Sequence, residues 1–288
     1  MFQTQYKEYL ALIEHYLENL PWQEDAINQS MRYSLIGGGK RIRPILALAS
    51  ADAVGGKAGE IVPAACALEL IHTYSLIHDD LPAMDNDDYR RGRLSNHKVF
   101  GEAMAILAGD ALLTYAFELL AQPLQVSPER QLQVVREVAA AAGQRGMVLG
   151  QVEDLAAEGK NLTITEVERI HEAKTGALLV ASARLGGILA GGSEEEIAAL
   201  TGYAKALGLA FQIKDDILDL EGDSETLGKP AGSDLRHQKA TYPSLLGLEG
   251  AREHLRSQVK NAQTALECLG ERASFLFDLA QFIEERQH

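Results

Sequence analysis

Residues 74–93 of the chain read YSLIHDDLPAMDNDDYRRGR, an apolar helical run followed at once by five acids and three arginines. Two carboxylates about 4 Å apart repel each other by roughly 4 kcal/mol at an effective dielectric near 20, so a cation is expected among them. Oxygen donors dominate this stretch, which contains no cysteine and a single histidine. Such donors suit a hard divalent cation such as Mg²⁺ better than zinc. The stretch therefore predicts a magnesium site at the end of a helix.

Two arginines that follow these acids indicate what the metal would hold. The guanidinium groups of Arg90 and Arg91 are suited to phosphate oxygens, and Mg²⁺ usually completes its shell with substrate phosphates and water. Asp79 and Asp85 are six positions apart, about 240° around an ideal helix, so they can share one metal only if the backbone leaves the helix. Pro82 provides such a break because it cannot donate the intrahelical hydrogen bond.

A second acidic cluster lies in residues 211–221, which read FQIKDDILDLE. Asp215 and Asp219 share one helix face, a turn apart, and Gln212 lies on that face three positions earlier. A solvated acidic face is the usual fate of such a run. Here apolar residues alternate with the acids, so the pattern favours a second functional carboxylate site.

Residues 36–44, IGGGKRIRP, combine three glycines with three cations. The glycines free the backbone, and Pro44 is well placed to open the next helix. A glycine turn before a helix N-terminus suits an anion, although the pattern is not a nucleotide-binding glycine fingerprint and a solvated basic loop remains an alternative. A polar loop at 222–241 carries Lys229 and Lys239, which could close over a phosphate or belong to a mobile loop.

The composition points to one helical domain over residues 1–288. Hydrophobic residues make up 46% of the chain and only eight prolines interrupt it, which favours long helices, and no linker, repeat or strand pattern divides it. The net charge of −14 argues against nucleic acid or an anionic membrane surface as partner. Cys66 and Cys268 have no metal-ligand spacing and are expected to be reduced.

The sequence also predicts a soluble, cytoplasmic protein. Residues 1–8 lack the basic and apolar regions of a secretory signal. The apolar run 177–190 is interrupted by Arg184, so no membrane span of about 20 residues is expected.

The apolar spacing predicts the helices, with capping boxes at Thr163/Glu166 and Ser193/Glu196 and a kink where Lys174 and Gly176 interrupt the pattern. The expected ranges are 3–20, 23–35, 44–54, 60–79, 101–121, 128–143, 144–156, 163–190, one from 193 through the second acidic cluster, and two within 242–288.

The order and spacing of these motifs identify a resemblance over residues 30–250. The motifs are Asp79-Asp80-x4-Asp85, then Arg90-Arg91, then Asp215-Asp216-x2-Asp219, with GGKRIRP at 38–44 upstream. The chain resembles the short-chain trans-isoprenyl diphosphate synthases, most like the bacterial farnesyl diphosphate type. The resemblance implies an all-α bundle of about ten or more helices around a central apolar cavity. It also implies a homodimer, with the two acidic motifs facing each other at the mouth of the cavity.

The resemblance also implies a role for each matching residue. Asp79, Asp85 and Asp215 would bind Mg²⁺, supported by Asp80, Asp216 and Asp219. Arg90, Lys174 and Lys229 would hold the allylic diphosphate, and Lys40, Arg43, His72 and Arg91 the isopentenyl diphosphate. Lys174, Thr175 and Gln212 would stabilise the allylic cation. About three Mg²⁺ ions are expected per site, with Mn²⁺ as an alternative.

The implied reaction condenses isopentenyl diphosphate with dimethylallyl and geranyl diphosphate to give farnesyl diphosphate. Loss of diphosphate produces an allylic cation, the isopentenyl double bond attacks it, and the released diphosphate takes the proton. Tyr74 and Ser75 lie five and four residues before Asp79. At about 1.5 Å per residue, Tyr74 is roughly 7.5 Å deeper along the helix and could floor the cavity at a C15 product.

Each alternative function makes its own demand on these motifs. A geranylgeranyl diphosphate synthase would share every motif except the chain-length floor. A terpene cyclase would carry a different second motif, and an EF-hand would need a Gly and a terminal Glu that are missing after Asp87. A phosphohydrolase using His78 and Asp79 would need further upstream histidines, for which His72 is a poor substitute. A non-catalytic synthase subunit would lack acids that are intact here. The acidic ending FIEERQH makes closure of the site by a basic tail questionable.

Overall fold

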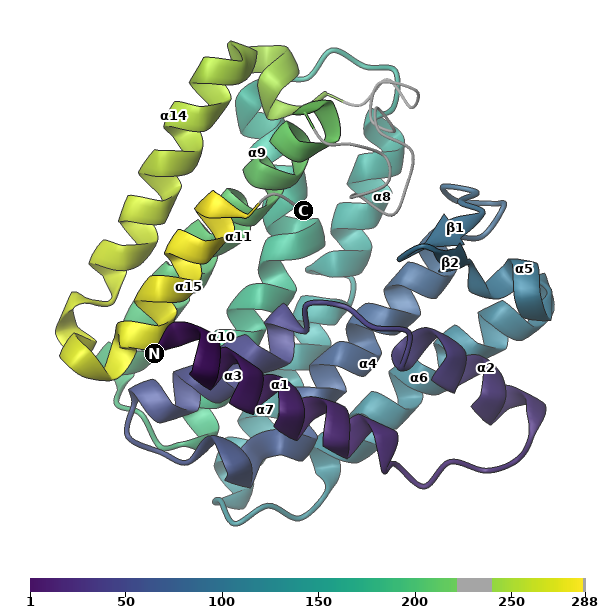
Figure 1. The fold of residues 1–288 in the computed structure, drawn as a ribbon, viewed down its shortest axis with the longest axis horizontal. Coiled ribbons are helices and arrows are strands. Elements are labelled where there is room, and N and C mark those ends of the chain that lie inside the picture. The colour runs from purple at the N-terminus through teal and green to yellow at the C-terminus, as the bar shows by residue number, and fades with distance from the viewer. Residues whose placement is uncertain (222–239, 287–288) are drawn as a thin grey trace.

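Helices provide nearly all the regular structure of residues 1–221 and 240–286, which the computed structural model describes (Figure 1). The expected all-α architecture is confirmed. The helices are α1 (Phe2–Glu18), α2 (Ala26–Leu35), α3 (Ile42–Ala53), α4 (Val62–Asp79), α5 (Asn96–Phe100), α6 (Glu102–Ala121), α7 (Pro128–Ala142), α8 (Met147–Ala157), α9 (Ile164–His171), α10 (Ala177–Leu189), α11 (Glu194–Glu221), α14 (Tyr242–Ala265) and α15 (Ser274–Glu285), with short turns η1 (Ala58–Ile61), η2 (Glu172–Gly176) and η3 (Glu267–Ala273).

The core lies around α4, which packs against α1, α2, α3, α6 and α10. Two helical segments reach the length and hydropathy of a membrane span, Ala58–Asp79 and Glu102–Ala121. In the first, 72% of the most apolar window is buried inside the bundle, so its hydropathy reflects a core helix. Glycine allows α3 and α10 to approach closely, because a Cβ on Gly186 would lie 2.0 Å from the carbonyl oxygen of Ala47.

Both expected capping boxes form. The Thr163 hydroxyl accepts from the Glu166 N–H while the Glu166 carboxylate accepts from the Thr163 N–H, and α9 begins there. Ser193 and Glu196 make the same reciprocal pair before α11. These bonds satisfy N–H groups that have no partner inside the helix. The interruption expected near Lys174 is η2, a single π-helical turn between α9 and α10.

The expectation that the chain has no strands was wrong in one place. Strands β1 (Tyr89–Arg90) and β2 (Arg93–Leu94) form an antiparallel hairpin joined by Arg91 and Gly92. Both joining residues have positive φ, 54° and 73°, as a tight type I′ turn requires. Strands of two residues are too short to show an alternating sequence pattern, which is why the hairpin was not predicted.

Candidate active site

The first acidic motif begins where α4 ends. The helix stops at Asp79, and the chain turns back so that the Asp85 N–H donates to the Asp79 carbonyl at 2.9 Å. The Asn86 N–H similarly donates to the Leu81 carbonyl at 3.1 Å. The backbone therefore departs from helical geometry after Asp79, which a metal site shared by Asp79 and Asp85 requires.

Burial dominates the electrostatics of this motif. It raises the pKa of Asp79 to about 6, with Lys174 opposing the rise and Asp85 adding to it. Asp80 is buried and ion-paired with Arg90, whose Nε lies 2.9 Å from its carboxylate, and Arg90 also reaches Asp87 at 3.2 Å. Arg90 is thus held among the carboxylates of the motif.

The second acidic motif lies near the C-terminal end of α11. The buried Asp216 carboxylate accepts from the Tyr242 N–H at 2.9 Å, which ties α11 to the start of α14. Asp215 is ion-paired with Arg286, just after α15. The Arg286 guanidinium also lies 4.2 Å from the centre of the Phe211 ring.

Arg286 was not predicted. The resemblance had made tail closure questionable because the tail is acidic overall, yet its single arginine is buried against the second motif. The only sequence signal was one cation among acids, and it became meaningful only once α15 had folded back against α11.

The glycine-rich loop presents its cations to the same region. Gly38 and Gly39 have φ of 89° and 131°, which side chains rarely adopt. Burial and the nearby Arg286 lower the pKa of Lys40 to about 8, and burial lowers that of Arg43 to about 10. Burial, with Arg43 and Arg91 close by, holds the pKa of His72 well below its usual value. His72 is therefore neutral near pH 7.

The turn η2 contributes a further cation, Lys174. A π-helical turn bulges one residue out of the helix, and such turns are frequent at functional sites. Lys174 donates to Asp154 on α8 at 2.7 Å. A Cβ on Gly150 of α8 would lie 2.2 Å from the backbone nitrogen of Lys174, so α8 packs directly onto the turn.

These elements surround one cavity of about 540 Å³. Most of the predicted site residues line it: Lys40, Arg43, His72, Arg90, Arg91, Lys174, Thr175, Gln212, Asp215, Asp216 and Asp219. Asp79, Asp80, Asp85, Tyr74 and Ser75 are not part of the lining, and Lys229 lies outside the described residues.

The predicted chain-length residues lie on α4 and are not among the residues that line this cavity, although Leu76 of the same helix is. Tyr74 is buried with its ring edge-to-face against His78, the centroids 5.7 Å apart. His78 Nε2 lies 3.0 Å from the Ile106 carbonyl oxygen, so this ring binds α6. The Ser75 hydroxyl donates to the His72 carbonyl. His78 is engaged by α6, which weighs against its use as a metal ligand in a phosphohydrolase.

The donor set is compatible with magnesium. Both motifs offer only carboxylate oxygens, the ligands that Mg²⁺ prefers. Within the described ranges 1–221 and 240–286, no three acids, histidines or cysteines come close enough to hold a metal alone. Magnesium commonly takes one or two carboxylates together with substrate phosphates, so a diphosphate would supply the missing ligands.

Comparisons with known proteins agree with this geometry. The polyprenyl synthetase family model matches residues 24–273. The chain is 48% identical over 278 residues to the farnesyl diphosphate synthase of Geobacillus stearothermophilus, covering 96% of this chain and 93% of that relative. It is 49% identical over 266 residues to the farnesyl diphosphate synthase of Bacillus subtilis (strain 168), covering 92% and 90%. The crystal structure of geranylgeranyl pyrophosphate synthetase from Pyrococcus horikoshii Ot3 matches with a TM-score of 0.89, at 35% identity and 98% coverage of each chain. The chain therefore belongs to the polyprenyl synthetase family.

Proposed function

We propose that this protein is a Mg²⁺-dependent trans-prenyltransferase that condenses isopentenyl diphosphate with dimethylallyl and then geranyl diphosphate, giving (2E,6E)-farnesyl diphosphate. The observation that carries the proposal is one cavity lined both by the cations of the glycine-rich loop and by the carboxylates of the second motif. The two ends of the cavity carry opposite charges, and each suits one anionic substrate. The cationic end would bind a diphosphate directly, and the carboxylate end would bind the other diphosphate through metal.

Isopentenyl diphosphate is assigned to the cationic end. Lys40, Arg43 and Arg91 line the cavity there, beside the neutral His72. Their forked and rotatable donors suit diphosphate oxygens, and a neutral imidazole can still donate one hydrogen bond. This end therefore binds a diphosphate that does not need to leave.

The allylic diphosphate is assigned to the carboxylate end. Asp79, Asp85 and Asp215 would hold Mg²⁺ there, with Asp80, Asp216 and Asp219 in support. When bound, the metal would neutralise charge that develops on the departing diphosphate. Lys174 and Arg90 line the cavity and would add positive charge beside the same leaving group. The family resemblance gives the same role to Lys229, which lies outside the described residues.

The protein's own groups then protect the allylic cation. Thr175 and Gln212 line the cavity, and their oxygen atoms can face the positive carbon. Leu76 and Leu179 belong to the same lining and limit access of water that would quench the cation. The released diphosphate is the proposed base, so no side chain is required to take the proton.

We also propose a cytoplasmic homodimer. Only 39% of the most apolar window of α6 is buried, and its Ile106 and Leu107 are 45% and 55% exposed. Val99 on the adjoining α5 is exposed too. An exposed apolar patch of this kind is typical of an interface.

Light scattering tests this interface. Leu107→Asp is expected to give monomers, whereas Phe277→Asp on the distant α15 should leave the dimer intact (Figure 1). Dimers from both variants would exclude the α6 interface.

Product analysis tests the reaction. Purified protein is incubated with isopentenyl diphosphate and either dimethylallyl or geranyl diphosphate, with and without Mg²⁺, and products are resolved by length. Mg²⁺-dependent C15 product from both primers is expected. Asp79→Asn should abolish it, while Asp88→Asn, an exposed acid paired with Lys98, should not. A C20 product would instead assign a geranylgeranyl diphosphate synthase, and no condensation would reject the proposed function.

A further inference from the structure

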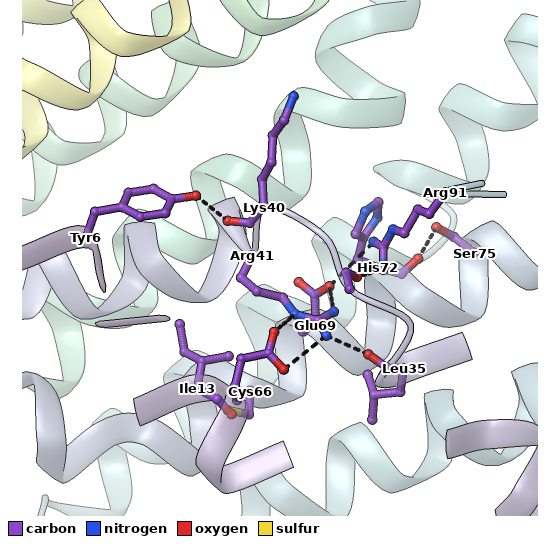
Figure 2. A network of polar contacts seen from close by, with 12 residues as sticks. Tyr6, Ile13, Leu35, Lys40, Arg41, Cys66, Glu69, His72, Ser75 and Arg91 are labelled. Atoms are coloured by element: carbon purple, nitrogen blue, oxygen red, sulfur yellow. Dashed lines mark hydrogen bonds and ion pairs between the residues drawn. The ribbon is translucent and has the colours of Figure 1, made fainter. Parts of the chain in front are cut away.

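Arg41 contributes to the same cavity lining as its neighbours Lys40 and Arg43, but its own side chain is buried. It lies between Lys40 and Arg43 in the chain, and its side chain is 0% exposed. Its φ of 49° is in the left-handed region, which costs energy for a residue other than glycine. Figure 2 shows the Lys40 side chain extending away from Arg41, which points toward Glu69. The loop thus sends neighbouring cations in different directions.

Three elements hold the Arg41 guanidinium. Its Nε donates to Glu14 of α1 at 2.7 Å, Nη1 to Glu69 of α4 at 2.7 Å, and Nη2 to the Leu35 carbonyl at the end of α2 at 2.7 Å. Glu14, Arg41 and Glu69 thus form one ion-paired cluster. Burial would lower the pKa of Arg41, but the two carboxylates outweigh it and raise the value. The guanidinium is therefore charged and fixed.

Glu69 also extends this cluster to the hairpin. It is 1% exposed, and its carboxylate lies 3.8 Å from Nη2 of Arg91. The Arg91 guanidinium donates in turn to the carbonyl of Gly38, across the glycine-rich loop. Gly39 leaves room for it, since a Cβ there would lie 2.7 Å from Arg91 Cζ. One buried carboxylate thus connects the loop that carries Lys40 and Arg43 with the turn that carries Arg91.

We propose that Glu69 and Arg41 are positioning residues that fix Lys40, Arg43 and Arg91 in the arrangement that receives isopentenyl diphosphate. The inference rests on the proposed function, since it assigns that substrate to the cationic end of the cavity. Both residues contribute to the cavity lining, but the side chains of Arg41 and Glu69 are 0% and 2% exposed, so neither needs to touch the substrate. A carboxylate beside an anion site would by itself weaken anion binding. The Glu69 carboxylate can still favour binding because it holds the arginines in place, and ordered donors lose less entropy when the anion binds.

The test is Glu69→Gln, which keeps the size and one acceptor for Arg41 but removes the charge shared with Arg91. The KM for isopentenyl diphosphate should rise about tenfold, the effect of one hydrogen bond to a charged group, while the KM for geranyl diphosphate stays within about twofold. Glu14→Gln is the matched control, because Glu14 holds the same arginine but acts on the charge of Arg91 more weakly than Glu69 does. Its KM for isopentenyl diphosphate should stay within about threefold. An unchanged KM in Glu69→Gln, or a lower one, would overturn the proposal.

A second variant covers loss of folding. Replacing a buried ion pair by apolar residues of similar size is often neutral for stability, so Arg41→Met with Glu69→Leu should fold, as thermal unfolding would show. Glu14 is 29% exposed in its side chain and can be solvated once its partner is gone. This double variant should show the same rise in KM, and a folded double variant with normal KM would refute the positioning role.

Calorimetry with inorganic diphosphate in the absence of metal separates this inference from the reaction itself. Wild type should bind diphosphate about tenfold more tightly than Glu69→Gln, with or without any condensation activity. A wild type that binds diphosphate in this way but makes no product would reject the proposed function alone. Equal diphosphate affinity in an active wild type and in Glu69→Gln would reject the positioning role alone.

Discussion

Arg90 and Arg91 are consecutive, yet their guanidinium groups contact different parts of the site. Arg90 is ion-paired with Asp80 in the first acidic motif, whereas Arg91 donates to the Gly38 carbonyl in the cationic loop. The tight turn formed by Arg91 and Gly92 separates them, because both residues have positive φ there. Two neighbouring arginines can therefore serve two different diphosphates.

Separate substitutions should reveal this division. Arg91→Ala is expected to raise the KM for isopentenyl diphosphate at least about tenfold and to leave the KM for geranyl diphosphate nearly unchanged. Arg90→Ala should raise the KM for geranyl diphosphate and the Mg²⁺ concentration at half-maximal rate, because Asp80 loses its partner. Steady-state kinetics with each substrate varied in turn measures both. Identical kinetic defects in the two variants would contradict the division.

Lys40 should give the reaction an alkaline limit. Its pKa is lowered to about 8, so the charged ammonium predominates below that pH and is lost as the pH rises through it. The kcat/KM for isopentenyl diphosphate, which reports groups of the free enzyme, should therefore fall above about pH 8. Lys40→Arg keeps its charge throughout and should move this limit to higher pH. A limit at the same pH in that variant would assign it to another group.

Arg286 should compete with metal for Asp215. The two side chains are ion-paired, and a cation that binds the Asp215 carboxylate must displace or share that contact. Arg286→Met keeps an apolar contact for the Phe211 ring but removes the charge. The Mg²⁺ concentration at half-maximal rate is expected to fall about threefold, within the range for a partly exposed ion pair. A higher Mg²⁺ requirement would show instead that Arg286 supports metal or substrate binding.

Tyr74 should limit the length of the product. Tyr74→Ala removes a buried ring from α4, the helix that also contributes Leu76 to the cavity, and a longer prenyl chain would extend into the space left behind. The expected main product is C20 instead of C15, detected by chromatography of the dephosphorylated alcohols. Tyr74→Phe keeps the ring and should still stop at C15. An unchanged C15 product from the alanine variant would reject Tyr74 as the residue that limits product length.

Gly150 should matter for activity more than for folding. An alanine Cβ there would meet the backbone of Lys174 at 2.2 Å, so the turn η2 or α8 must move. Overpacking of this kind typically costs about 1–3 kcal/mol of stability. Gly150→Ala should lower kcat at least about tenfold, since a misplacement of about 1 Å in a site is costly. Gly59→Ala meets nothing within 4 Å and is the control for thermal unfolding and kcat; equal kcat in both variants would contradict the role of this contact.

The helices and caps could be predicted because they depend on local patterns. The Thr163 and Ser193 caps and the interruption near Lys174 each rest on residues within a turn of one another, and all three are present. The break after Asp79 was likewise predictable from Pro82, and the helix ends there. Helix ends near the N-terminus shifted by a few residues, since fraying and capping decide them.

Other features depend on contacts between distant parts of the chain. Arg41 looked like one more cation of the loop, and only the packing of α1, α2 and α4 around it shows that it is buried. Glu69 had no signal in an apolar helix apart from its charge. The Asp215 and Arg286 pair joins residues 71 positions apart. No periodicity or motif within a short window could have paired them.

The single π-helical turn at η2 fixes how many residues the chain needs between α9 and α10. Residues 164–189 would form an uninterrupted α-helix if one residue, for example Ala173, were deleted. Such a deletion rotates one side of the segment relative to the other by about 100°, one residue of an α-helix. Lys174 and Thr175 could then not both keep facing the cavity. Gly186 of α10 would also lose its close approach to Ala47 of α3, so a change of chain length at this turn disturbs the bundle and the site together.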